Sequence, residues 1–540
     1  MQLPPDLTAT ELELREIATL GGILDLTGRA PNEQVVRAGL IYNLCVASSD
    51  AHAKGVRLTG ATVDGCVDFG AATLKVPLIL RKCAVGASLR PASIAINLEQ
   101  TCGTWISFDE CVVHGGISAV QLCLTTSLSL ADSTVRGIVD LTGAEISGTV
   151  VMDRATIEGV NDGGNSLIAD GIKIGGSMLA RGVRVAGAIR LPVAEISRTL
   201  EMDGAELNGS DADGDALTAD GLTVRGNFFL RDEFSAAGCV RLPGATVSGS
   251  MQFGPAALNG HSGDGISLLA SRAKFGRVVF LPNVTSAGSI TFAEAQIEGR
   301  LDLAGATRIP SLVLQGTTCS EFADSEASWP PEGNLVAVGF KFDRIDERAN
   351  RVDRLQWVRR QGFTDWSPDL YEQLGAFYTR VGDESSARAI RIAKNDDELT
   401  HLKRTHKTGS LPYRFWRRPF GWLLGYGYRR WVAGWLLVLL VVLASLGFWK
   451  LHDLGAMTPN VSSDLASQPC GVAYTCFNAA AYGADVVLPI VDFGQETAWR
   501  PNARANWGWL AESLQWFAIA SGWLLVSIFV AAFTNLIRRD

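Results

Sequence analysis

Three consecutive stretches of eleven residues decide the fold: SLSLADSTVRG at 127–137, IVDLTGAEISG at 138–148 and TVVMDRATIEG at 149–159. In each, an apolar residue stands fourth, a small one follows three places later, a β-branched one two places after that, and glycine ends the unit. The same template recurs on both sides, with its leading apolar residue at Leu58, Phe69, Leu80, Phe108, Ala119, Ala180, Leu191, Met202, Leu242, Phe253, Leu281, Phe292 and Leu303.

This short fixed period is typical of a solenoid, whose units bury their apolar side only by stacking on their neighbours. Apolar and polar residues alternate over four or five positions and glycine follows, which indicates a strand and a turn rather than a helix. Two units make a coil of about 22 residues, with coils about 4.8 Å apart as strands are in a sheet. We therefore predict a right-handed parallel β-helix, and the pattern leaves open the number of faces per coil.

Insertions rich in Gly and Asp interrupt this period at similar intervals. They cover residues 161–166, 210–216 and 261–265. Because the interval is nearly four units plus a short loop, we expect them along one edge of the solenoid. Asp211, Asp213 and Asp215 alternate as calcium ligands do. No bidentate Glu follows at the required offset, so solvated loops are the favoured interpretation.

Composition and periodicity divide the 540 residues into a solenoid and a membrane part. The 57 glycines and 19% charged residues fit a β-solenoid punctuated by glycine. The predicted segments are an N-terminal cap at 1–50, the solenoid at 51–310, a junction with a helical hairpin at 311–400, a basic juxtamembrane segment at 401–430, transmembrane helices at 431–449 and 513–537, and an external loop at 450–512.

Both predicted spans lack charged residues and are long enough to cross a bilayer. Basic residues precede the first span and Arg538 and Arg539 follow the second, which places both flanks in the cytoplasm. The chain begins without the basic and apolar regions of a signal peptide. We therefore expect the solenoid and both termini on the cytoplasmic side of the cell (inner) membrane.

The basic cluster itself adjoins a span, so attraction to anionic lipid explains it better than binding of nucleic acid. Its members are Lys403, Arg404, Lys407, Arg414, Arg417, Arg418, Arg429 and Arg430. The lipid bilayer is thus one expected partner.

Cysteines differ between the two parts of the chain. Eight of the ten lie in the solenoid or its junctions, where we expect them to act as small apolar residues in a reducing compartment. Cys470 and Cys476 are the only pair in the predicted external loop. Their separation allows a short disulfide loop, and the sequence leaves open whether it forms.

A helical connector is predicted between the solenoid and the membrane, at roughly 345–400. Tyr371, Leu374, Phe377 and Tyr378 recur at helical spacing and Gly382 ends the run. One hairpin of the tetratricopeptide kind cannot form a superhelical groove. We expect it to cover the last coil, which otherwise presents an open sheet edge.

Several motifs resemble a group of bacterial proteins with pentapeptide-like β-solenoids and C-terminal membrane hairpins. They are PDLYEQLGAFY at 368–378, GYGYR at 425–429, YGADVVLPIVDFGQE at 482–496 and WRP at 499–501. The group usually has Ser-Leu where this chain has Gly483 and Ala484. Its members are often catalogued as membrane-associated oxidoreductases, so the resemblance implies that activity without implying a mechanism.

Motifs of redox and nucleotide enzymes are otherwise absent from the sequence. No Gly-x-Gly-x-x-Gly follows a strand and opens a helix, and neither a phosphate-binding Gly-rich loop nor Cys-x-x-Cys occurs. The six histidines are dispersed and none stands at metal-ligand spacing. The sequence therefore indicates no cofactor and no catalytic residue, and whether the chain is an enzyme stays open.

The external loop offers an alternative function. Residues 476–489 are apolar for a loop and contain a single acid, Asp485. This arrangement between two spans resembles the re-entrant segment of two-span channels, which requires a homo-oligomer. The other interpretation is an amphipathic segment on the membrane surface. The candidate functional residues of this segment are Asp485, Pro489, Asp492, Gln495, Glu496 and Trp499.

The function that the sequence favours is an interaction scaffold: a rigid cytoplasmic rod held at the membrane by a helical hairpin. A solenoid alone does not define a function. The choice depends on the lack of a convergent set of acid, base or ligand residues, and the protein partner stays unidentified.

Overall fold

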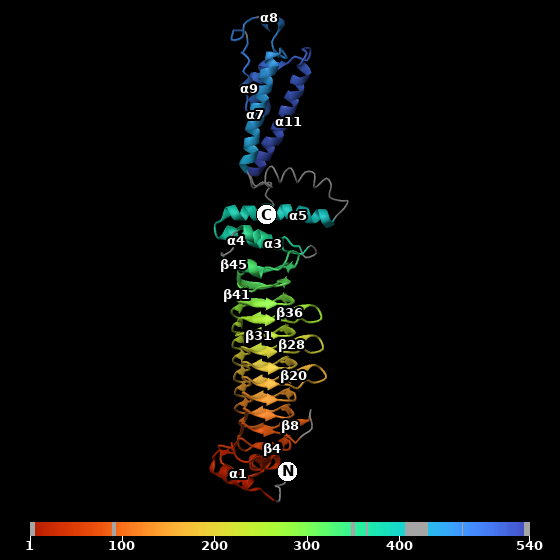
Figure 1. The fold of residues 1–540 in the computed structure, drawn as a ribbon. Helices are drawn as coiled ribbons and strands as arrows, with labels where there is room; N and C mark the ends of the chain where they lie inside the picture. The colour runs from red at the N-terminus through yellow and green to blue at the C-terminus, as the bar shows by residue number, and fades with distance from the viewer. Residues whose placement is uncertain are drawn as a thin grey trace. The chain divides into compact units, whose positions relative to one another are not determined.

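The structure is a computed structural model that describes residues 6–88, 93–346, 351–362, 366–405, 430–466, 468–472 and 474–533. Residue contacts divide the chain into two compact units, Met1–Val381 and Gly382–Asp540. The first unit consists mostly of parallel strands and the second mostly of helices (Figure 1). The two units are described separately.

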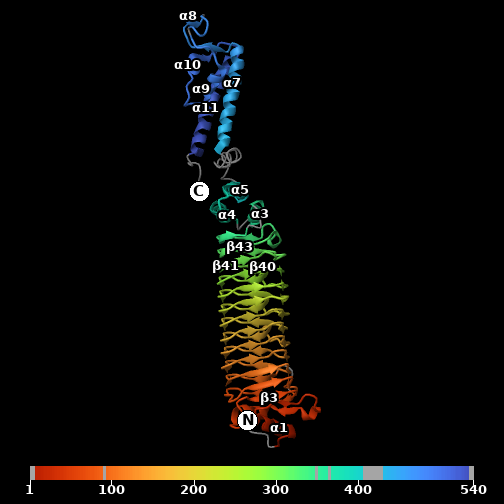
Figure 2. The same cartoon turned by 90° about the vertical axis from the view of Figure 1, so that its left-hand side faces the viewer.

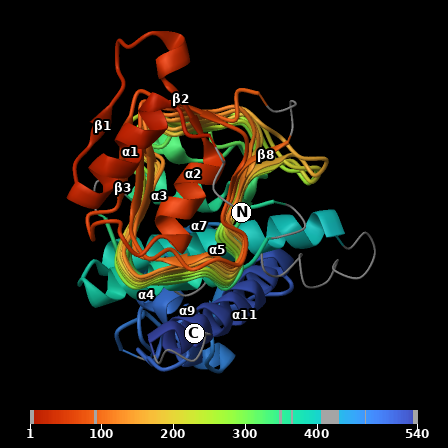
Figure 3. The same ribbon diagram turned by 90° about the horizontal axis from the view of Figure 1, so that it is seen from below.

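Four short strands make up a regular turn of the first unit. One turn contains β10 (Ile106–Asp109), β11 (Val112–Val113), β12 (Gly116–Ser118) and β13 (Cys123–Leu124). Strands β10 and β13 belong to a 22-stranded sheet, β11 to an 11-stranded sheet and β12 to a 12-stranded sheet. All pair in parallel with the next turn. Successive turns superpose when the stack is seen along its length (Figure 3).

The register between turns follows the eleven-residue period. Ile106 pairs with Leu128 and Leu128 with Val150, in steps of 22 residues, so each turn holds two units. The next step, from Val150 to Met178, is 28 residues because the loop at 161–166 lies within it. Leu130, which leads its unit, is 1% exposed. The predicted apolar positions therefore face the interior of the stack.

Many units end in glycine, and at Gly137 and Gly148 the preceding turn lies directly against this residue. A Cβ on Gly137 would lie 2.3 Å from the backbone nitrogen of Gly116, and a Cβ on Gly148 would lie 2.3 Å from the carbonyl oxygen of Thr126. Both contacts are with backbone, which cannot rotate away. At these two positions, a larger residue would push two turns apart.

The parallel pairing extends beyond the predicted limits of 51–310. At the N-terminal end β1 (Leu24–Asp25) pairs with β3 (Val56–Thr59). At the other end β43 (Thr318–Ala323) pairs with β45 (Lys341–Ile345). The predicted cap and junction segments thus each contribute strands to the stack, and helix α1 (Ala9–Leu20) covers the first turns (Figure 1).

The three inserted loops stack on one another along one edge, as predicted. They precede β20 (Asn165–Ile168), β28 (Asp215–Thr218) and β36 (Ile266–Leu269), beside which Figure 1 shows them protruding. A Cβ on Gly164 would lie 2.7 Å from the Cα of Asp211 in the next loop. The N–H of Gly263 donates to the carbonyl of Asp213 at 3.2 Å.

Helices α3 (Arg351–Val358) and α4 (Asp369–Arg380) close the last turns of the first unit. Trp357 is fully buried, with its ring 5.3 Å from that of Phe322. Gly382 ends the helical run with φ +84°, as the sequence predicts. The predicted hairpin is nevertheless divided, because the following helix α5 (Glu384–Thr405) belongs to the second unit. The pair that covers the last coil is α3 and α4.

The second unit contains two helices long and apolar enough to cross a membrane. They are α7 (Arg430–Asp453) and α11 (Gly508–Phe533), with qualifying segments at Gly434–Asp453 and Gly508–Val530. Between them lie β46 (Met457–Pro459), α8 (Ser463–Ala466), α9 (Ala479–Val487), α10 (Gln495–Ala498) and β47 (Trp499–Pro501). Strands β46 and β47 pair antiparallel, and α9 and α10 lie alongside α7 and α11 (Figure 2).

Candidate functional site

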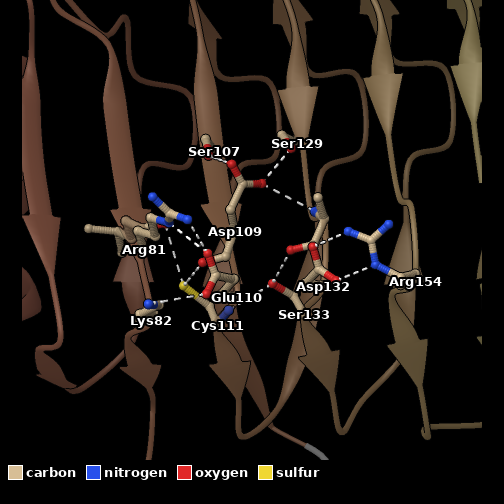
Figure 4. Close-up of polar contacts among 12 residues, drawn as sticks. Arg81, Lys82, Ser107, Asp109, Glu110, Cys111, Ser129, Asp132, Ser133 and Arg154 are labelled. Atoms are coloured by element: carbon tan, nitrogen blue, oxygen red, sulfur yellow. Dashed lines mark hydrogen bonds and ion pairs between the residues drawn. The ribbon is translucent and has the colours of Figure 1, made fainter.

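A ladder of charged residues follows one corner of the parallel stack (Figure 4). Lys82, Glu110, Asp132 and Arg154 occupy this corner on successive turns, with φ between +51° and +57°. Such backbone is uncommon for residues with a Cβ. In later turns the same corner is occupied by glycine, such as Gly204 with φ +65°. Glycine is the residue that usually marks such backbone, so the sequence did not indicate that charged residues also adopt it here.

The charges of this ladder pair between turns. Arg81 donates to Glu110 at 2.7 Å, and Arg154 donates to both carboxylate oxygens of Asp132 at 2.6 Å. The hydrogen bond from Arg154 lowers the pKa of Asp132, and that from Arg81 lowers the pKa of Glu110. Each of these two carboxylates therefore forms an ion pair with a cation of a neighbouring turn. These ion pairs link the turns and leave neither carboxylate unpaired for a substrate.

A shallow hollow of about 290 Å³ lies farther along the stack. It is lined by Glu145, Lys173 and Glu195 from strands in register. The Lys173 ammonium donates to Glu145 at 2.9 Å. Within the described ranges, no group of three or more His, Cys, Asp or Glu side chains is placed to hold a metal ion.

In the second unit, the predicted external segment folds against the two apolar helices. Gly483 of α9 lies where a Cβ would be 2.8 Å from the backbone nitrogen of Ser445 on α7. Gly522 of α11 lies where a Cβ would be 2.0 Å from the carbonyl oxygen of Val487, the last residue of α9. Helix α9 thus lies directly against both helices, and the close contact with Ser445 requires a glycine at 483.

The position of α9 along α11 follows from the α11 residue that the carboxyl end of α9 contacts. Gly522 is 14 residues from Gly508, in a segment that continues to Val530. At 1.5 Å per residue, Val487 lies roughly 21 Å from the Gly508 end. The carboxyl end of α9 therefore lies against the middle of α11.

Asp485 is 6% exposed and holds the chain after α9 in place. Its carboxylate accepts hydrogen bonds from three backbone N–H groups, those of Phe493 at 2.5 Å, Gln495 at 2.8 Å and Glu496 at 3.3 Å. Gln495 and Glu496 are the first two residues of α10 and Phe493 lies just before it, and the N-terminal end of a helix favours a negative charge. The single acid noticed in the sequence is thus fully engaged by backbone.

Gln495 and Trp499 continue this network toward the disulfide loop. The buried Gln495 side chain accepts from the N–H of Asn478 at 3.0 Å and donates to the carbonyl of Cys476 at 3.3 Å. Trp499 donates its indole N–H to the carbonyl of Thr475 at 2.9 Å. The structure places a disulfide between Cys470 and Cys476, with Cα atoms 4.9 Å apart.

The other candidate residues of the segment lie at its surface. Pro489 is half-buried, Asp492 is exposed and accepts from the N–H of Gly494 at 2.7 Å, and Glu496 is exposed with its carboxylate 3.4 Å from the amide of Gln515. Sequence reasoning missed three exposed apolar side chains between them, those of Ile490, Val491 and Phe493. Ile490 is 82% exposed and Phe493 59% exposed.

The side chains of the predicted basic cluster lie outside the described part of the structure. Lys407, Arg414, Arg417, Arg418 and Arg429 lie outside the described residues, and for Lys403, Arg404 and Arg430 only the helical backbone is described.

Two cysteines of the first unit differ from the prediction. Cys102 and Cys123 are exposed, whereas Cys45, Cys83, Cys111, Cys239 and Cys319 are buried as expected. Cys102 and Cys123 are 21 residues apart, one fewer than two eleven-residue units, so the period alone does not align them.

Comparison with protein-family models, curated proteins and solved structures finds no match for this chain.

Proposed function

We propose that this protein is a homo-oligomeric membrane protein in which α9 and the segment after it, residues 488–494, line a path for ions between subunits. The observation that carries the proposal is the contact of Val487 with Gly522, which brings the end of a short helix to the middle of an apolar one.

Membrane chemistry supplies the argument. Irregular backbone at membrane depth is tolerated only where protein buries it or where it lines a water-filled cavity. Residues 488–494 are not helical. They connect Val487, which lies against Gly522, to Glu496, which lies beside Gln515, and these two residues of α11 are roughly 10 Å apart along the helix. Ile490 and Phe493 are exposed within this unit. Neighbouring subunits around a central path would remove this segment from lipid.

The helix direction favours cations. The carboxyl end of α9 carries a partial negative charge, and membrane transporters use the carboxyl ends of broken helices to coordinate Na⁺. Asp485 has a structural role in this proposal, because its oxygens already accept three backbone hydrogen bonds.

Reconstitution into vesicles tests the proposal. We expect potassium flux to exceed chloride flux, and crosslinking in the membrane to trap an oligomer. Monomeric protein without flux would refute it.

Cysteine labelling tests whether the segment after α9 is exposed to water. Ile490→Cys should react with a membrane-impermeant thiol reagent, in a background with Cys66→Ser, Cys102→Ser and Cys123→Ser, which removes the free thiols that are not buried. Leu446→Cys is the matched control, because Leu446 is 56% exposed and adjoins Ser445, which lies against α9. Leu446→Cys should stay unlabelled, and equal protection of both positions would contradict an aqueous path.

A scaffold role for the first unit is a second candidate, supported by its stacked parallel turns. In this proposal the sheets close into a right-handed β-solenoid on the cytoplasmic side of the inner membrane, and the row containing Glu145, Lys173 and Glu195 faces a protein partner. Crosslinking in native membranes through this row would identify the partner. Labelling of Cys102 only after membrane permeabilisation would support the cytoplasmic orientation.

The oxidoreductase activity implied by the resemblance gains no support from the described side chains. Visible absorbance or flavin fluorescence of the purified protein would revive that hypothesis.

A further inference from the structure

Cys102 and Cys123 stand directly opposite each other on adjacent turns. Strands β9 (Cys102–Gly103) and β13 pair in parallel with Cys102 aligned to Cys123. The N–H of Cys123 donates to the carbonyl of Thr101 at 2.8 Å, and the N–H of Thr125 to that of Gly103 at 3.0 Å. Aligned residues of parallel strands point to the same face, so the two thiols are neighbours.

Both thiols are on the outer face of the sheet. Cys102 and Cys123 are exposed, while Leu124, the next residue of β13, is 1% exposed. Burial raises the pKa of the Cys123 thiol, and the neighbouring Cys102 thiol and the Glu145 carboxylate raise it further. The influence of the Cys102 sulfur on the pKa of Cys123 agrees with the close approach of the two side chains.

A second pair provides an internal comparison. Cys83 and Cys111 also lie on adjacent turns, with the N–H of Cys83 3.4 Å from the sulfur of Cys111. They are 2% and 1% exposed, and their thiols lie against the carbonyls of Leu58 and Leu80. Of these two cysteine pairs, only Cys102 and Cys123 are accessible to reagents in solution.

We propose that Cys102 and Cys123 form a dithiol site that undergoes reversible thiol–disulfide exchange with small disulfides of the glutathione class. The thiolate of one cysteine attacks the small disulfide, forming a mixed disulfide and releasing one small thiol. The thiolate of the other attacks the protein sulfur of that mixed disulfide and releases the second thiol. Two protein thiols are oxidised, one small disulfide is reduced, and the two protons pass to the two released thiolates.

The sheet geometry makes this bond reducible. Neighbouring strands are about 4.8 Å apart, which lies within the Cα separation of disulfides, about 4.4–6.8 Å. The usual Cβ separation is shorter, about 3.5–4.5 Å. Closing the bond must draw two hydrogen-bonded turns together by a few tenths of an ångström, and strained, exposed disulfides are the labile ones.

The test uses the full-length protein in detergent. The protein is equilibrated with glutathione buffers of increasing disulfide fraction, alkylated and digested, and its peptides are identified by mass spectrometry. We expect a crosslinked peptide containing Cys102 and Cys123 to appear with rising glutathione disulfide and to disappear when reduced glutathione is restored. Cys83 and Cys111 should remain thiols throughout.

The Cys102→Ser variant separates the two steps of exchange. Without its partner, Cys123 should accumulate the mixed disulfide with glutathione, which the native pair resolves. If the native protein shows both thiols still reduced, or both carrying glutathione without a crosslink, the proposal is wrong. Neither result depends on ion conduction by the second unit.

Discussion

Replacing Gly522 with alanine tests whether α9 is held at mid-depth. The added Cβ would lie 2.0 Å from the carbonyl oxygen of Val487, whereas ordinary contact begins at 3.4 Å, so the helices must separate by about 1.4 Å (3.4 − 2.0). Forced expansion of a packed interior costs about 1–3 kcal/mol. At 1.36 kcal/mol per tenfold change, about 2 kcal/mol lowers the folded-to-unfolded ratio roughly 30-fold.

Gly447→Ala is the matched control on α7. Its Cβ would lie 2.7 Å from Cδ2 of Leu514, the mobile end of a side chain that can change rotamer. We expect this variant to stay within about 0.5 kcal/mol of the wild-type protein. Both substitutions add one methyl group to an apolar helix, so they differ mainly in what the methyl group meets.

The assay is equilibrium unfolding in mixed micelles with increasing SDS, followed by ion flux in vesicles. Gly522→Ala should shift the unfolding midpoint downward and reduce flux, and Gly447→Ala should do neither. Equal stability of the two variants would show that the end of α9 does not lie against Gly522, and would remove the basis of the proposed path.

Other substitutions test separate parts of the structure. Asp485→Asn should destabilise the second unit by about 1–3 kcal/mol in the same SDS titration, because its amide cannot accept all three backbone hydrogen bonds; altered ion selectivity at unchanged stability would instead place the side chain in the path. Gly137→Ala should lower the thermal midpoint of the first unit, since its Cβ meets backbone at 2.3 Å, whereas Gly263→Ala, with nothing within 4 Å, should not; equal midpoints would contradict the stacking. Burial raises the pKa of Asp215 to about 6, with Asp211 contributing, so the folded state holds this proton and stability should fall as pH rises from about 4 to 6; Asp215→Asn should flatten that dependence in unfolding curves, and a carboxyl titrating near its usual value by NMR would contradict the assignment. Asp324→Asn should cost about 3–5 kcal/mol in denaturant unfolding, because Arg354, 2.5 Å away and buried, loses its counter-charge; a loss below 1 kcal/mol would mean that the pair is solvated.

Predictions from the sequence were most successful where structure is set by near neighbours along a repeat. The eleven-residue period gave the parallel stacking, the buried apolar positions and the loops along one edge, because each turn meets only the turns before and after it. Length and apolar character likewise identified the two long helices, with ends that differ by a few residues from the predicted ones.

Contacts between distant residues required the tertiary structure. Cys102 and Cys123 are 21 residues apart, one fewer than two units of the repeat, so their alignment follows from the register of β9 with β13 and not from the period. Likewise, the sequence marks Asp485 as unusual among apolar neighbours, yet its carboxylate meets backbone groups eight to eleven residues later only after the chain folds back. In a repeat, the local residue pattern determines which turns lie next to each other. The position of a single chain reversal between two helices depends instead on how side chains far apart in the sequence pack, and no local pattern of residues encodes that packing.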